Sequence, residues 1–146
     1  MLSPGSGRVM PPGTHDQRRD VMTNALNWFE IPVADLARAN RFYGALLRTE
    51  LREETFNDVP MALLPYQQGG VGGALVRNHQ LAPSAQGTVV YLDAGDDLDG
   101  ALERVKAAGG QVVMGRTHIS DDIGSIAFFV DTEGNRVGLH ERPSPS

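Results

Sequence analysis

The chain has 146 residues, the length of one domain, and 40% of them are hydrophobic while 21% are charged, as in an ordinary globular protein. Its net charge of -5, with Lys and Arg scattered along the chain, argues against a nucleic-acid partner. The sequence has no cysteine, which excludes disulfides and thiolate chemistry, and it has no apolar run of about 18 residues, so we expect no membrane span.

Residues 1–22 are rich in Pro and Gly and show no hydrophobic periodicity. They also lack the apolar stretch of a secretory signal, so a cytoplasmic protein is expected. We therefore predict a disordered tail over 1–22, a single folded domain over 23–142 and a short second tail over 143–146.

The first half of the domain, residues 26–77, begins with an alternating apolar run at 27–33 that predicts a strand. Asp35 then suits the N-cap of a helix over 35–47, because its carboxylate can accept free backbone N–H groups of the first turn. Three further strands are predicted at 51–56, 61–66 and 71–77. A turn at Asn57-Asp58 joins the first two of these strands. The third carries a Gly72-Gly73 pair, which suggests close approach of a backbone or a ligand.

A linker over 78–87 leads to a second half, residues 88–141, with the same plan. We predict a strand at 88–94, a helix at 97–108, a strand at 111–114, a loop through His118, and strands at 125–130 and 136–141. The turn between the last two strands requires a positive φ, which Gly134 or Asn135 can adopt.

The two halves therefore form an internal repeat with a period of about 60 residues, too long for a solenoid. Each is a βαβββ module, and one module alone leaves an apolar sheet face and unpaired edges. Two such modules predict an α+β domain with a cup-like, eight-stranded mixed sheet, in which the hollow of the cup is the expected site of function.

Two stretches carry a family resemblance. Residues 28–43 follow the pattern Trp-Phe-Glu-Ile-Pro-Val-Ala-Asp-Leu-x-Arg-Ala-x-x-Phe-Tyr, and residues 129–139 read Phe-Val-Asp-Thr-Glu-Gly-Asn-Arg-Val-Gly-Leu. Both resemble the vicinal oxygen chelate superfamily of glyoxalases, bleomycin-resistance proteins and extradiol dioxygenases. The resemblance spans residues 27–141 and implies the two-module fold, with activities that range from lyases and dioxygenases to proteins that only bind drugs.

Metal-using members of that superfamily supply His, Gln or Glu ligands from the first and last strand of each module. The resemblance places these positions at Trp28, Ala74, Thr88 and Gly138. Three of these residues have no metal-binding side chain, and a lone threonine is a poor ligand. We therefore expect no metal and no other cofactor.

The alternation of side chains along a strand indicates which neighbours share the hollow with those positions. Glu30, Val90, Arg136 and His140 qualify. Glu30 and His140 are the candidate catalytic residues, either as an acid–base pair or as two unconventional metal ligands.

The sequence thus favours a homodimeric protein that binds a small, partly apolar molecule without a metal. Two alternatives remain open: a lyase- or dioxygenase-like enzyme using Glu30 and His140, and a protein that acts only through its dimer surface. The predicted ligand-binding residues are Trp28, Ala74, Thr88, Val90, Arg136 and Gly138.

Overall fold

The computed structural model describes residues 24–144, so the predicted tail at 1–22 lies outside the described residues. The two helices and eight strands follow the predicted order. They are β1 (Trp28–Pro32), α2 (Leu36–Leu47), β2 (Arg52–Phe56), β3 (Val59–Leu64), β4 (Gly72–Val76), β5 (Tyr91–Asp93), α3 (Leu98–Ala107), β6 (Gln111–Ser120), β7 (Gly124–Val130) and β8 (Arg136–Glu141).

The strands form two four-stranded mixed sheets, ordered β1-β4-β3-β2 in the first module and β5-β8-β7-β6 in the second. In each sheet the first strand pairs in parallel with the last strand of its module, and the remaining pairs are antiparallel. The repeated topology confirms the two βαβββ modules. The eight strands are divided equally between two sheets.

Both helices begin at an aspartate N-cap, of which Asp35 was predicted, and both bury one apolar face. The Asp35 carboxylate accepts the backbone N–H of Arg38 at 3.0 Å, and the Asp97 carboxylate accepts that of Gly100 at 2.9 Å. These bonds satisfy N–H groups that have no partner within the helix. The buried helical residues are Ala39, Phe42, Tyr43 and Leu46 in α2, and Leu98, Ala101, Leu102 and Val105 in α3.

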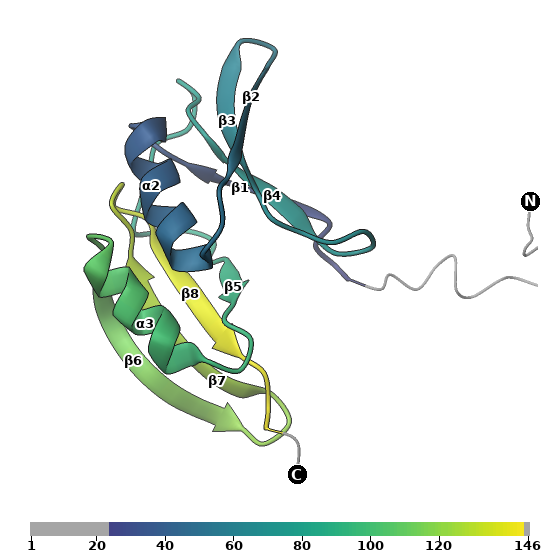
Figure 1. Cartoon of the computed structure of the whole chain (residues 1–146), viewed down its shortest axis with the longest axis vertical. Helices are drawn as coiled ribbons and strands as arrows, with labels where there is room; N and C mark the ends of the chain where they lie inside the picture. The colour runs from purple at the N-terminus through teal and green to yellow at the C-terminus, as the bar shows by residue number, and fades with distance from the viewer. Residues whose placement is uncertain (1–23, 145–146) are drawn as a thin grey trace, which may run out of the picture.

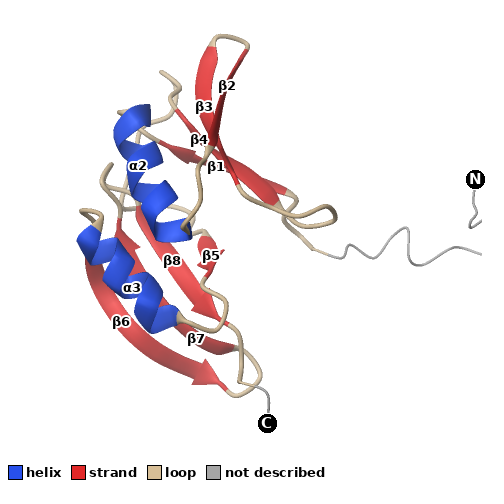
Figure 2. Ribbon diagram, viewed as in Figure 1, coloured by secondary structure: helices blue, strands red, loops and turns tan. Residues whose placement is uncertain are grey.

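The two modules share one hydrophobic core. Helices α2 and α3 contact each other on the same side of the molecule, and α3 lies across one face of its own sheet (Figure 1). Phe42 of α2 packs against Phe129 of β7, with ring centroids 5.7 Å apart. Among the elements of residues 24–144, the close backbone approach between the modules is that of α2 to α3, and the two sheets do not pair with each other (Figure 2). The modules are therefore joined through their helices and loops.

Two of the predicted turns are confirmed by backbone angles. Asn57 and Asp58 have φ values of 51° and 64°, as a tight hairpin between β2 and β3 requires, and Gly134 takes the positive φ, 93°, between β7 and β8. The Gly72-Gly73 pair does allow close approach, but by aromatic rings of its own module. A Cβ at Gly72 would overlap Tyr66, and one at Gly73 would overlap Phe29.

The predicted loop at residues 115–120 is wrong, because β6 continues through these residues to Ser120. Its pairing with β7 shifts register three times, between Val112 and Met114, between Met114 and Thr117, and between His118 and Ser120. Each shift interrupts the alternation on which strand prediction depends. Neither α2 nor α3 is long and apolar enough to cross a membrane, and residues 24–144 contain no other helix.

Candidate functional site

A short turn, residues 131–135 between β7 and β8, connects the two modules and forms one end of the candidate site. We call it the inter-module turn. Its Glu133 carboxylate accepts the backbone N–H groups of Ala34 and Asp35 at 2.9 and 2.8 Å and pairs with Arg38 at 2.6 Å. Burial alone would raise the pKa of Glu133, but the hydrogen bonds from Arg38, Asp35 and Ala34 outweigh it and lower the pKa to about 2. Glu133 is therefore ionised where it meets the start of α2.

The same turn is fixed by a buried hydrogen-bond network. Tyr43 of α2 donates its hydroxyl to Asp131 Oδ2 at 2.6 Å, and burial together with the charge of Asp131 raises the Tyr43 pKa well above its usual value. Asn135 donates to the carbonyl oxygen of Pro32 at 2.7 Å and accepts the backbone N–H of Ser84 at 2.9 Å. The network joins α2, β1 and the linker to the inter-module turn.

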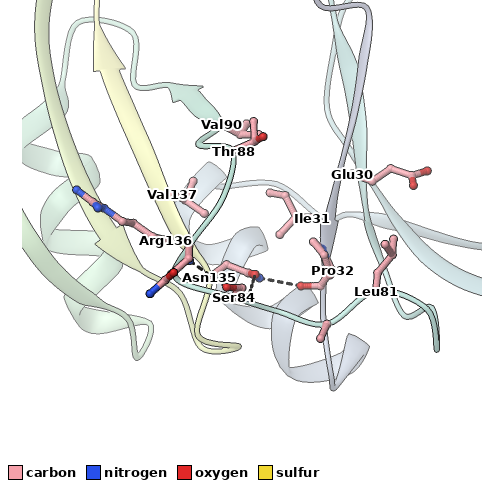
Figure 3. A pocket seen from close by; sticks show the side chains of 12 residues that line it. Glu30, Ile31, Pro32, Leu81, Ser84, Thr88, Val90, Asn135, Arg136 and Val137 are labelled. Carbon is pink, nitrogen blue, oxygen red and sulfur yellow. Dashed lines mark hydrogen bonds between the residues drawn. The ribbon is translucent and has the colours of Figure 1, made fainter.

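An open cavity of about 400 Å³ lies beside this network, which we call the inter-module cavity. Four of the predicted site residues line it: Glu30, Thr88, Val90 and Arg136. In Figure 3, Glu30 and Arg136 stand on opposite walls, and their side chains point away from each other. The other lining residues are Ile31, Pro32, Leu81, Ala82, Ser84, Gln86, Asn135 and Val137.

The second sheet has one face covered by α3, and we call its other face the open face (Figure 1). A second cavity, of about 420 Å³, lies on the open face, and we call it the sheet-face cavity. Val137 and Leu139 of β8 point into the core, so Arg136, Gly138 and His140 alternate onto the open face. This sheet-face cavity is lined by Tyr91, Asp93, Ile119, Ile123, Ile126 and His140. Since Arg136 lines one cavity and His140 the other, the two cavities lie toward opposite ends of β8.

The structure does not bring the predicted catalytic residues together. Glu30 lines the inter-module cavity and accepts the indole N–H of Trp28 at 3.3 Å, whereas His140 lines the sheet-face cavity. His140 is instead opposite Asp93 in the parallel pairing of β5 with β8. The carboxylate opposite His140 in the strand pairing is therefore that of Asp93, which the sequence analysis did not select.

The remaining predicted wall residues lie on strand faces outside the lining of these two cavities. Trp28 is 40% exposed on β1, directly opposite Gly72, while Ala74 is fully buried opposite Glu30. Gly138 lies beneath the Tyr91 ring, so that a Cβ there would overlap the ring.

The superfamily's metal chemistry needs several N or O donors around one ion. The four positions that the resemblance selects carry Trp28, Ala74, Thr88 and Gly138, and the described residues contain no group of three or more His, Asp or Glu side chains suited to a metal. In the pairing of β5 with β8, Gly138 is opposite Tyr91, and Thr88 lies before the start of β5. The residues present do not fit the expected metal site.

Sequence reasoning also missed Asp93, Ile119, Ile123 and Ile126 as lining residues. Asp93 occupies a strand end that reads equally well as the approach to a helix cap. Ile119 and Ile123 fall between the strands predicted at 111–114 and 125–130, and Ile126 lies in the second of those strands. One feature could have indicated Tyr91 as a lining residue: it is an aromatic residue in a strand that pairs with a glycine-bearing strand.

Comparison with known proteins agrees with the fold. The model of the family described as Glyoxalase/Bleomycin resistance protein/Dioxygenase superfamily matches residues 25–139. Proteins of Mycobacterium bovis and Mycobacterium tuberculosis named "Putative glyoxylase CFP32" are 28% identical over 131 residues, which cover 84% of this chain but 48% of theirs. The chain thus spans about half the length of these curated relatives.

Solved structures show the same fold at lower identity. A glyoxalase/bleomycin resistance protein from Albidiferax ferrireducens superposes with a TM-score of 0.64 at 18% identity, covering 82% of this chain and 100% of that one. TnmS3, an antibiotic binding protein from Streptomyces sp. CB03234, superposes with a TM-score of 0.61 at 20% identity, covering 84% of this chain and 98% of that one. With the two repeated modules and the match over residues 25–139, the chain belongs to the glyoxalase/bleomycin resistance protein/dioxygenase superfamily.

Proposed function

We propose that this protein binds a small, partly apolar molecule on the open face of its second sheet, without a bound metal ion. The observation that supports the proposal is the lining of the sheet-face cavity. Three isoleucines and Tyr91 supply apolar surface, and Asp93 and His140 are the polar side chains beside them. Ligand sites in proteins have this composition, a mostly apolar concavity with a few polar groups that orient the ligand.

The exposure of these side chains supports the same proposal. Ile119, Ile123 and Tyr91 are 45%, 52% and 45% exposed, although a monomeric protein gains by covering large apolar side chains. The fold is also that of an antibiotic binding protein, TnmS3, although 20% identity carries no ligand from that protein to this one. The misfit of the family's metal positions favours binding over metal-assisted turnover.

The test uses a neutral apolar fluorophore, N-phenyl-1-naphthylamine, titrated into the full chain. We expect one saturable site, and we expect Ile123→Glu to weaken it at least tenfold by placing a charge in the cavity. Val113→Glu is the matched control, because Val113 of β6 has nearly the same exposure as Ile123 but does not line the cavity. Equal affinity in both variants, or no saturable binding by the wild type, would contradict the proposal.

An enzyme remains a second candidate, favoured by the position of one imidazole. His140 Nε2 lies 2.6 Å from the carbonyl oxygen of Ile123, which can only accept, so Nε2 carries the proton and Nδ1 is an acceptor in the neutral ring. A histidine oriented in this way can act as a general base. Turnover that is lost in His140→Ala, while the fluorophore still binds, would favour this reading.

We also propose that the protein is a homodimer. β1 and β5 are each one of the two edge strands of their sheet, and Trp28 on β1 is 40% exposed. Unpaired edges with apolar side chains are surfaces that a second copy can cover. Light scattering should give twice the mass of the chain, and a monomer at all concentrations would refute this proposal.

A further inference from the structure

The order of side chains along β8 limits the chemistry of the ligand. On the open face, Gly138 lies between Arg136 and His140 and is flanked by Tyr91 on β5 and Phe128 on β7. The two aromatic rings have their centroids 5.5 Å apart. Because Gly138 has no side chain, the Tyr91 ring lies against the strand, and two aromatic rings inclined at 49° to each other cover the middle of the face.

One end of this surface carries a positive charge. The Arg136 guanidinium carbon lies 4.4 Å from the centroid of the Phe128 ring, and the arginine forms no ion pair with any residue from 24 to 144. By contrast, Arg38 and Arg116 are each paired with a carboxylate. Glu30 shares the inter-module cavity with Arg136 but points away from it (Figure 3). The Arg136 N–H groups are thus positioned to bind an anionic group that lies beside the rings.

The other end offers hydrogen-bond acceptors. Asp93 uses Oδ1 to accept the backbone N–H of Gly95 at 2.7 Å, and its Oδ2 accepts no hydrogen bond from residues 24–144. His140 donates through Nε2 to Ile123, which leaves Nδ1 as a second acceptor. A hydroxyl group on the ligand would satisfy this end. Phe128 is opposite Gly138, and His140 is two residues further along β8, a distance of about 6.6 Å along the strand.

We propose that the open face binds an aromatic acid, with its carboxylate at Arg136, its ring on Tyr91 and Phe128 over Gly138, and a phenolic hydroxyl at Asp93 and His140. This inference rests on the proposed binding function and adds the chemical class of the ligand. Its three elements correspond to three separate side-chain groups, so each can be removed singly from the ligand and from the protein.

The ligand test compares 4-hydroxycinnamate with its methyl ester, which lacks the charge, and with cinnamate, which lacks the hydroxyl. Calorimetry on the full chain should show the methyl ester binding about tenfold more weakly than the acid, the equivalent of about 1.4 kcal/mol. Arg136→Gln should weaken the acid about tenfold and leave the ester within twofold. Asp93→Asn should reduce the preference for 4-hydroxycinnamate over cinnamate and leave cinnamate unchanged.

A pair of glycine variants tests the aromatic surface. Gly138→Ala should displace the Tyr91 ring and weaken 4-hydroxycinnamate about tenfold. Gly72→Ala is the matched control, since Gly72 lies beneath Tyr66 and Trp28 in the first module, and it should leave affinity unchanged. If either variant fails to fold, Tyr91→Leu and Tyr66→Leu make the same comparison.

The outcomes separate this inference from the function on which it rests. Equal affinity for the acid and its ester, or an acid preference that survives Arg136→Gln, overturns the aromatic-acid inference while the neutral fluorophore result keeps the binding function. If neither the fluorophore nor any of the three cinnamates binds, both proposals are wrong. A loss of affinity in Gly72→Ala equal to that in Gly138→Ala also overturns the assigned position of the ring.

Discussion

The two helices begin in the same way, yet the carboxylates that complete their first turns come from different distances along the chain. At α3, Glu141 of the same module accepts the Leu98 N–H at 2.9 Å and pairs with Arg116. At α2, Glu133 comes from the opposite module and accepts two backbone N–H groups. The first module therefore completes its helix start only through contact with the second, whereas the second module does so internally.

The two carboxylates also differ in burial, and therefore in how much each contributes to stability. The Glu133 side chain is 0% exposed and that of Glu141 is 15% exposed. The hydrogen bond from Arg116 and then that from Leu98 lower the pKa of Glu141, and a larger set of donors lowers that of Glu133 to about 2. We therefore expect substitutions at the inter-module turn to cost more than equivalent substitutions at Glu141.

The largest effect is expected for Glu133→Ala. It leaves the backbone N–H groups of Ala34 and Asp35 without their acceptor, and we expect it to lower the free energy of unfolding by about 3 kcal/mol. Urea denaturation followed by circular dichroism measures this. Glu54→Ala, which removes an exposed carboxylate paired with Arg52, should change stability by less than about 0.5 kcal/mol. Equal losses in the two variants would refute the role of Glu133 in joining the modules.

The next effect is a pH dependence that belongs to Glu133. Its pKa is about 2 in the folded protein and 4.5 for the free side chain, so its stabilising contribution is complete above about pH 4.5 and is lost as the pH falls toward 2. Allowing for the solvent around Arg38, we expect about 2 kcal/mol to disappear across this window. Urea midpoints of the wild type and Glu133→Gln should converge between pH 4.5 and 2.5. A constant difference over that range would contradict the assignment.

A smaller effect is expected for Tyr43→Phe. Asp131 loses its hydrogen bond from the buried hydroxyl but keeps the one from Asn135 at 3.1 Å, so we expect a loss of about 1.5 kcal/mol. Tyr66→Phe is the control, because Tyr66 is 56% exposed and should be neutral. Thermal melting of the two variants makes the comparison, and a neutral Tyr43→Phe would show that the Tyr43 bond to Asp131 adds nothing to stability.

The smallest effect is expected for Glu141→Gln, which weakens one helix-start hydrogen bond and one ion pair within the second module. We expect a loss of about 1 kcal/mol in denaturant titration. Glu103→Gln, at a carboxylate 74% exposed on α3, should be silent. A loss in Glu141→Gln as large as that in Glu133→Ala would remove the distinction between the two helix starts.

Much of the fold was predictable because its signals are local. The N-cap at Asp35, the helical spacing of apolar residues and the Asn57-Asp58 turn each act over a few residues, and each is confirmed. The continuation of β6 was not predictable, because its register shifts remove the alternation that marks a strand.

The site was less predictable because its contacts are distant in sequence. Glu133 reads locally as a turn residue, and nothing near it indicates that Arg38, 95 residues earlier, is its partner. Strand alternation correctly placed Arg136, Gly138 and His140 on one face of β8. It could not show that Asp93, rather than Glu30, lies opposite His140, since pairing between strands depends on topology.

The position of Glu133 has a consequence for synthesis on the ribosome, where the N-terminal part of a chain emerges first. Residues 28–76 contain every strand of the first sheet and the whole of α2, yet the acceptor for the Ala34 and Asp35 N–H groups is made about a hundred residues after them. The emerging first module must therefore wait with an incomplete helix and an uncovered core face while the second is translated. Slow codons or a chaperone acting during that interval should influence the yield of folded protein more than the same intervention after residue 135.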